Sequence, residues 1–252
     1  MTTSDAFAGL PVPDVLPDPW VVVRETDWLS LDTGFGTGEE VPGVLVRLRG
    51  PDLTAEETGQ VLGDLGLRHQ NSIYEATVPA ALCVAAVLAR RADQYPGAAD
   101  GVCVLLLEWL ADVAFDFDDA CPEALQHRFD DVFVDGYTPV MVAARALRPA
   151  LYLAVAPFLD DPDTAVADTA LSAALVFAEH PGLAGHRDGL AERARRVLLT
   201  CDIRWRRRQA LDALNAWGHD TTGLARPGDE DRSPYVTGRS WGGGWHPENP
   251  PF

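Results

Sequence analysis

Along most of the chain, hydrophobic positions recur every three or four residues, the spacing of one apolar face of an α-helix. The pattern begins near residue 25 and ends near residue 218. The segments that carry it are 38–49, 54–68, 76–91, 99–116, 138–159, 163–180, 186–199 and 202–217. The sequence therefore predicts an all-α protein.

Local signals support several of these helices. Thr54 and Glu57 form the S/T-x-x-E pattern of a capping box, and Pro42 and Pro79 fall in first turns, where a missing N–H is harmless. Gly218 follows the last helix as a typical C-terminal stop. The segment 99–116 is apolar nearly all round, which predicts a central position.

Three segments lack the helical pattern. Residues 1–24 are rich in proline and predict an extended arm. Residues 117–137 are acidic, contain Pro and Gly, and predict a long insertion loop with at most a short helix. Residues 219–252 form a Gly- and Pro-rich tail, in which Trp241 and Trp245 are costly to leave in water. We expect part of this tail to dock on the helices or on a partner.

A repeated layout appears in the segments EEVPGVLVRL, EATVPAALCVAAVL and YTPVMVAARAL: an acidic or turn residue, then a β-branched residue and proline, then an apolar helix. Pro42 and Pro79 are 37 residues apart, a spacing typical of HEAT repeats, whereas Pro79 and Pro139 are 60 apart. The longer gap fits an insertion within a repeat. Residues 25–218 thus predict a HEAT-like α-solenoid of stacked antiparallel helix pairs.

The segment HQNSIYEATVP, residues 69–79, resembles a motif of bacterial HEAT-repeat proteins common in actinobacteria, HQGTxYEAT-P. Asn71 stands where glycine is usual. The resemblance is close over 67–90 and loose over 25–218. It implies a HEAT-repeat fold, and it implies that roles as adaptors or in toxin immunity are possible for this chain.

Charge narrows the classes of partner. The chain has 38 carboxylates, 20 arginines and no lysine, so its net charge is −18 and its pI about 4.5. Binding to DNA, RNA or an anionic membrane needs basic side chains and is disfavoured. A basic protein partner is favoured. No run of about 18 apolar residues and no secretory signal is visible, so we expect a cytoplasmic protein.

The strongest acidic feature lies around the predicted insertion. Its residues are Asp112, Asp116, Asp118, Asp119, Glu123, Asp130, Asp131 and Asp135. A solvated loop and a surface that binds a basic partner are two interpretations. A Mg²⁺ or Ca²⁺ site is a third, because these ions need several carboxylates. DFDD superficially resembles an aspartate motif of terpene cyclases, but no second metal motif follows.

The most distinctive local text is the stretch that contains His69, Gln70, Ser72 and Tyr74. These side chains either face a partner or belong to a turn between repeats that satisfies helix ends. We favour the structural interpretation, because such turns recur for packing reasons.

The arginine-rich stretch 187–208 is a candidate for phosphate binding only if the charge of the whole chain is ignored. We expect Arg204 to Arg208 to pair with the chain's own carboxylates, to pair with the DDPD turn at 160–163, or to coat a solvated face. Cys83 and Cys103 lie in apolar helical patterns, so we expect both to be buried as small apolar side chains.

No GxSxG, HExxH, Walker or strand-bound GxGxxG motif is present, and Gly34 to Gly38 predict a linker. We therefore nominate no catalytic residue and no cofactor. The sequence predicts a non-catalytic protein–protein interaction module, immunity- or antitoxin-like in its most specific form. Two alternatives stay open: a metal-dependent enzyme or metal-binding protein using carboxylates of 112–135, and a nucleic-acid mimic.

Overall fold

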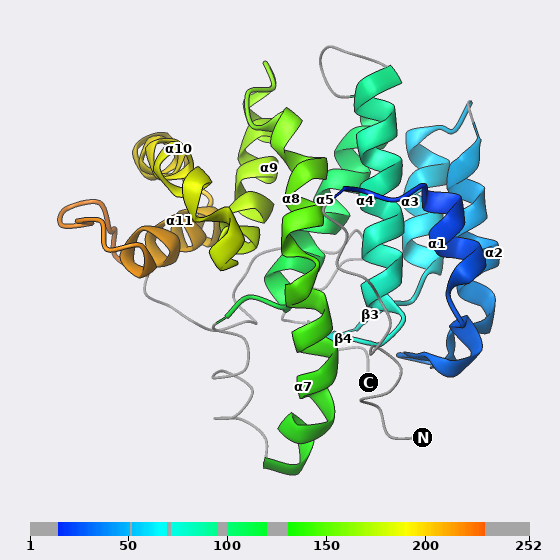
Figure 1. Ribbon diagram of the computed structural model, residues 1–252. Coiled ribbons are helices and arrows are strands. Elements are labelled where there is room, and N and C mark those ends of the chain that lie inside the picture. The colour runs from blue at the N-terminus through cyan, green and yellow to red at the C-terminus, as the bar shows by residue number, and fades with distance from the viewer. Residues whose placement is uncertain (1–14, 51, 70–71, 95–99, 120–130, 230–252) are drawn as a thin grey trace, which may run out of the picture.

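The computed structural model describes residues 15–50, 52–69, 72–94, 100–119 and 131–229. Within these ranges the chain is mostly helical, and its strands are two short hairpins. Helices α1 and α2 lie at one end of the molecule and α10 and α11 at the other, with the remaining helices between them (Figure 1). The all-α prediction is confirmed.

The first element, α1 (Pro19–Glu25), lies within the arm that the sequence predicts to be extended. Asp18 caps this helix by accepting a hydrogen bond from the Trp20 backbone N–H at 2.8 Å, and proline occupies the first helical position. Val22 and Val23 are buried, and α1 contacts α4. The prolines therefore start a packed helix rather than prevent one; residues 1–14 lie outside the described ranges.

Short elements follow up to residue 49. They are η2 (Trp28–Ser30), β1 (Asp32–Thr33), β2 (Gly36–Thr37), η3 (Gly38–Glu40), α2 (Val41–Val46) and η4 (Arg47–Arg49). Strands β1 and β2 pair in antiparallel register, with Asp32 opposite Thr37. The glycine-rich stretch that we expected to be a linker is thus a β-hairpin, and Gly36 supplies its positive φ of 137°.

The next helices match the sequence pattern closely. Helix α3 (Ala55–Asp64) begins with the predicted capping box of Thr54 and Glu57. A second hairpin, β3 (Arg68–His69) with β4 (Ser72–Ile73), leads into α4 (Thr77–Gln94), and α5 (Gly101–Asp116) follows.

The predicted insertion loop is helical in part. Residues 120–130 lie outside the described ranges, but α7 (Asp131–Ala146) already includes residues 131–137 and contains Pro139 inside the helix. Helix α8 (Arg148–Val155) and η5 (Ala156–Phe158) continue after a bend of 46° next to Pro149, because proline is a common cause of helix kinks.

The last elements also follow the predicted pattern. They are α9 (Thr164–Phe177), η6 (Pro181–His186), α10 (Arg187–Thr200) and α11 (Arg204–Ala216). Gly218 ends the series with a φ of 78°, as predicted for a stop.

Helix α5 is central, as its apolar sequence predicts. It packs against α3, α4 and α9, and Leu106, Leu110 and Ala114 are fully buried. Helix α4 also contacts α8, while α9 contacts α8, α10 and α11. Cys83 and Cys103 are buried in this core as small side chains, as predicted.

One finding concerns membrane spans. Among the described residues no single helix is long and apolar enough to cross a bilayer. The bent pair Pro139–Ala146 and Arg148–Phe158 passes that test only when the two helices are taken together.

Candidate functional site

A buried arginine lies at the end of α5 and organises part of the predicted acidic cluster. Arg148 is 3% exposed. Its guanidinium donates to Asp119 Oδ1 at 2.9 Å, to Glu179 Oε2 at 2.5 Å and to the Phe117 carbonyl oxygen at 2.9 Å. The guanidinium also lies 5.6 Å from the centre of the Phe117 ring. Arg148 therefore ties the C-terminal ends of α5 and α9 to the start of α8.

Arg145, one turn earlier along the chain, holds the same turn from α7. Its Nε donates to the Phe117 carbonyl oxygen at 3.1 Å, and its terminal nitrogen donates to the Asp118 carbonyl oxygen at 2.5 Å. Arg145 also lies 3.4 Å from the Asp119 carboxylate. The two arginines thus bind the backbone as well as the carboxylates, which is the chemistry of a structural clamp.

Glu179, a half-buried partner of Arg148 in this clamp, has a strongly raised pKa. Its carboxylate accepts a hydrogen bond from the Asp119 backbone N–H at 3.0 Å in addition to the one from Arg148. Burial raises the pKa of Glu179, and so does the charge of Asp119 and Asp118, whereas Arg148 lowers it; the net result is a pKa of about 8. Perturbed carboxyls often mark functional sites, but structural ion-pair networks produce the same shift.

The described residues in the rest of the predicted acidic cluster differ in their exposure to solvent. Asp116 is 1% exposed and Asp112 is half-buried, whereas Asp119 is exposed and paired with arginine. Glu123 and Asp130 lie outside the described residues, and the side chains of Asp131 and Asp135 at the start of α7 do as well. Within the described part of the chain, no group of three His, Cys, Asp or Glu is placed to hold a metal ion.

The distinctive HQxSxY stretch forms the second hairpin. His69 lies in β3 and Ser72 in β4, with side chains outside the described set, as is the whole of Gln70. Tyr74 is half-buried, and its ring lies so close to Gly34 that a Cβ there would be 3.1 Å from the ring. The tyrosine thus packs the two hairpins together, which supports the structural interpretation at that position.

Two residues just after the stretch satisfy the backbone around it. Glu75, 6% exposed, accepts a hydrogen bond from the Asp32 N–H at 3.0 Å. The Thr77 hydroxyl accepts from the Tyr74 N–H at 2.9 Å and donates to the Leu67 carbonyl oxygen at 2.7 Å. These contacts couple the two hairpins to the start of α4.

Several arginines of this stretch pair with the chain's own carboxylates, as predicted for Arg204 to Arg208, but the contact with the DDPD turn comes from Arg193. Arg206 pairs with Asp168 at 3.3 Å, and Arg193 pairs at 2.6 Å with Asp160 of the DDPD turn. Arg207 is buried with Asp229, at 2.8 Å, and also donates to the carbonyl oxygens of Leu198 and Leu224. The described part of the tail, residues 219–229, therefore docks on α10 and α11; Trp241 and Trp245 lie outside the described residues.

A further surface was missed by the sequence analysis. The segment 25–40, which we call the acidic edge, has five exposed carboxylates and no basic residue. They belong to Glu25, Asp27, Asp32, Glu39 and Glu40. None of the five makes an ion pair with another described residue. The sequence does contain one indication of this surface, because no arginine occurs between Arg24 and Arg47.

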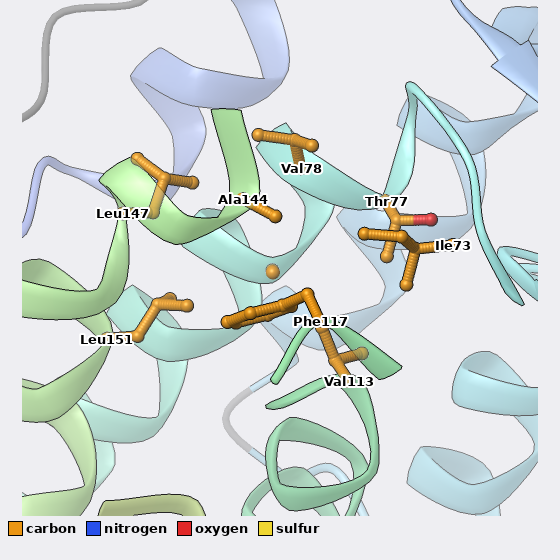
Figure 2. A pocket seen from close by; sticks show the side chains of 9 residues that line it. Ile73, Thr77, Val78, Val113, Phe117, Ala144, Leu147 and Leu151 are labelled. Carbon is orange, nitrogen blue, oxygen red and sulfur yellow. The ribbon is translucent and has the colours of Figure 1, made fainter. Parts of the chain in front are cut away.

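One small cavity lies in the core beside the Arg148 clamp. Figure 2 shows apolar side chains from α4, α5, α7 and α8 around it, including Val78, Phe117, Ala144 and Leu147. Its volume is about 10 Å³, room for about one water molecule. A space of this size does not accommodate a substrate.

Comparisons with known proteins identify no relative. The chain matches no family model, no curated protein and no solved structure.

Proposed function

We propose that the protein is a non-catalytic interaction module that binds a basic protein partner through the acidic edge. The observation that carries this proposal is the uneven use of charge. Residues 1–130 contain 22 carboxylates against 7 arginines, whereas residues 131–252 contain 16 against 13. On α9 to α11 several carboxylates are paired with arginine, but those of the acidic edge face solvent without such a partner among the described residues.

Unpaired carboxylates on one end of a molecule attract a basic partner and orient its approach. The attraction also operates at a distance of roughly one Debye length, about 10 Å at 0.1 M salt. A role of this kind needs no catalytic residue, and it fits the closed apolar core and the structural use of Arg148.

The arrangement of the helices supports a finer proposal about the fold. Helices α4 and α5 form one pair, and α8 and α9 form the next. The first helices of the two pairs, α4 and α8, are in contact, and so are the second helices, α5 and α9. Stacking of this kind is typical of α-solenoids, and we propose a short HEAT-like solenoid that holds the acidic edge at one end. An immunity-like role is the most specific form of the same proposal.

The proposed metal-ion function has less support in the described residues. Asp119 is engaged by Arg145 and Arg148, and Asp116 is buried. A divalent ion at these positions would have to compete with two guanidinium groups that are already in place.

Peptide binding tests the proposal. The probe is a fluorescent twelve-residue peptide of six arginines and six serines, titrated with the full-length protein at 25 and 150 mM NaCl. The edge variant neutralises three carboxylates: Asp27→Asn, Glu39→Gln and Glu40→Gln. Loss of three exposed charge pairs is expected to weaken binding at low salt by roughly tenfold.

The matched control removes the same number of charges elsewhere. It combines substitutions at three other exposed carboxylates: Glu56→Gln, Asp93→Asn and Glu108→Gln. This variant is expected to bind within about twofold of the natural protein. Equal weakening of both variants would show that the peptide responds to net charge alone and would overturn the assignment to the acidic edge.

A further inference from the structure

The acidic edge also presents large apolar side chains to solvent. Leu29 in η2 is 61% exposed, and Phe35 at the tip of the first hairpin is 79% exposed. Phe35 directly precedes strand β2, and β2 contacts η2, the element that carries Leu29. Single exposed apolar residues are common on protein surfaces, but here two large ones lie within a segment of five carboxylates.

The backbone of the acidic edge is held in place before any partner binds. Asp32 is fixed on both sides, because its N–H donates to Glu75 and its carbonyl oxygen accepts from the Ala76 N–H at 3.0 Å. The Gly38 N–H donates to the Leu31 carbonyl oxygen at 2.8 Å. The Trp28 indole donates to the Val23 carbonyl oxygen at 2.9 Å. Little ordering entropy is then lost on binding, which favours a docking role.

The Phe35 ring is positioned by the same packing. Gly66, with a φ of 59°, turns the chain after α3, and a Cβ at that position would lie 3.2 Å from the ring. The ring thus lies against the backbone of this turn, and Phe35 remains 79% exposed.

We propose that the acidic edge docks an amphipathic basic segment of a partner protein, in which arginine or lysine side chains alternate with large apolar ones. This inference rests on the proposed function and adds the chemistry of the partner. The basic side chains would pair with the carboxylates, and the apolar side chains would cover Leu29 and Phe35. Salt would weaken the first set of contacts much more than the second.

Two peptides of equal length and charge test this inference. One is the arginine–serine peptide described above, and the other replaces three serines with leucine and two with tryptophan. The amphipathic peptide is expected to bind at least fivefold more tightly than the polar peptide at 150 mM NaCl. Phe35→Ala and Leu29→Ala, made separately, are each expected to remove at least half of that preference while leaving the polar peptide unaffected.

Matched controls are available on other helices. Val142 on α7 is 61% exposed and Leu153 on α8 is 45% exposed, and neither lies near the acidic edge in the chain. Val142→Ala and Leu153→Ala are expected to leave the preference unchanged. Because all four side chains face solvent, each variant should keep its circular dichroism spectrum, which confirms folding.

The outcomes separate this inference from the proposed function. Equal affinity for both peptides, with the charge-neutralised edge variant impaired, would overturn the inference and leave the proposed function intact. A preference that Val142→Ala or Leu153→Ala abolishes as well would also overturn it. Failure of both peptides to bind at 25 mM NaCl would overturn the proposed function together with the inference.

Discussion

At the scale of single residues, the buried pair of Arg207 and Asp229 shows how an acidic chain uses its arginines. The Arg207 side chain is 2% exposed and that of Asp229 is 5% exposed. The Asp229 carboxylate also accepts from the Arg226 N–H at 2.8 Å. Hydrogen bonds on all sides make such a pair tolerable in the interior, although its net stabilisation relative to an apolar core is small.

Removing only one partner of this pair lowers the stability strongly, because the remaining buried charge has no opposite charge beside it. Arg207→Met keeps the side-chain volume and is expected to lower the free energy of unfolding by about 3–5 kcal/mol. Urea denaturation followed by circular dichroism measures this. The exposed pair of Arg47 and Asp64 is the control, for which Arg47→Ala is expected to cost about 1 kcal/mol or less. Equal losses would show that Arg207 is not buried in solution.

Glu179 gives a pH dependence of defined sign. Its pKa is raised to about 8 in the folded protein from an ordinary value of 4.5. The folded state therefore binds this proton more tightly than the unfolded state does. The stabilising contribution is complete below pH 4.5 and is lost as the pH rises through about 8.

Glu179→Gln is accordingly expected to flatten the fall in unfolding free energy between pH 5 and pH 8.5. Urea titrations at several pH values measure this for the natural protein and the variant. Glu192→Gln, at an exposed glutamate of α10, is the control and should leave the slope unchanged. A slope that Glu179→Gln does not alter would contradict the raised pKa.

At the scale of elements, the close contact between η2 and η3 requires a glycine. A Cβ on Gly38 would lie 2.8 Å from the Trp28 carbonyl oxygen, closer than van der Waals contact. Nothing lies within 4 Å of a Cβ on Gly43, which is inside α2. The two glycines thus occupy opposite environments five residues apart.

Alanine at these two positions is expected to have opposite effects. Gly38→Ala should lower the free energy of unfolding by about 1–3 kcal/mol, because the backbone must move to relieve the clash. Gly43→Ala should raise it by about 0.5–1 kcal/mol, because alanine favours the helix. Thermal denaturation of both variants tests this, and destabilisation by Gly43→Ala would contradict the description of α2.

The helices themselves were largely predictable from local signals. Thr54 with Glu57, Pro42 and Gly218 each mark a helix boundary within a few residues, because capping and stop signals act over one turn. The sequence pattern starts a helix at residue 138, which would put Pro139 in its first turn, but the structure starts α7 at Asp131 and has Pro139 inside the helix. Proline is tolerated there although its ring removes one helical hydrogen bond. The hairpins escaped prediction because strands of two residues carry too short a pattern to recognise.

At the scale of the whole molecule, the order of packing predicts a gradient of local stability. Helix α5 is covered by α3, α4 and α9, whereas the acidic edge and the segment 219–229 have one side open to solvent. Opening free energies follow buried contacts, so the slowest amide hydrogen exchange is expected in α4, α5 and α9. Mass spectrometry of exchanged peptides measures this, and protection of the acidic edge equal to that of α5 would contradict the gradient.

The candidate site was less predictable than the fold. The sequence identified an excess of acid and predicted a binding surface among carboxylates of residues 112–135; of those that the structure describes, Asp116 is buried and Asp119 is held by arginine. Counting carboxylates along the chain does not reveal which of them meet an arginine far away in sequence, since such pairs form only when helices pack. The acidic edge stands out because its carboxylates form no ion pair with an arginine among the described residues.

The sequence by itself determined the helical class, most helix positions and the acidic character, because propensity, capping and composition are local properties. Tertiary structure alone decided that 19–25 is a packed helix, that 32–37 forms a β-hairpin, and which carboxylates are paired with arginine. These outcomes depend on contacts between residues distant in the chain, such as Asp32 with Glu75 and Arg148 with Glu179. The free energy of such contacts depends on burial, which no local pattern specifies.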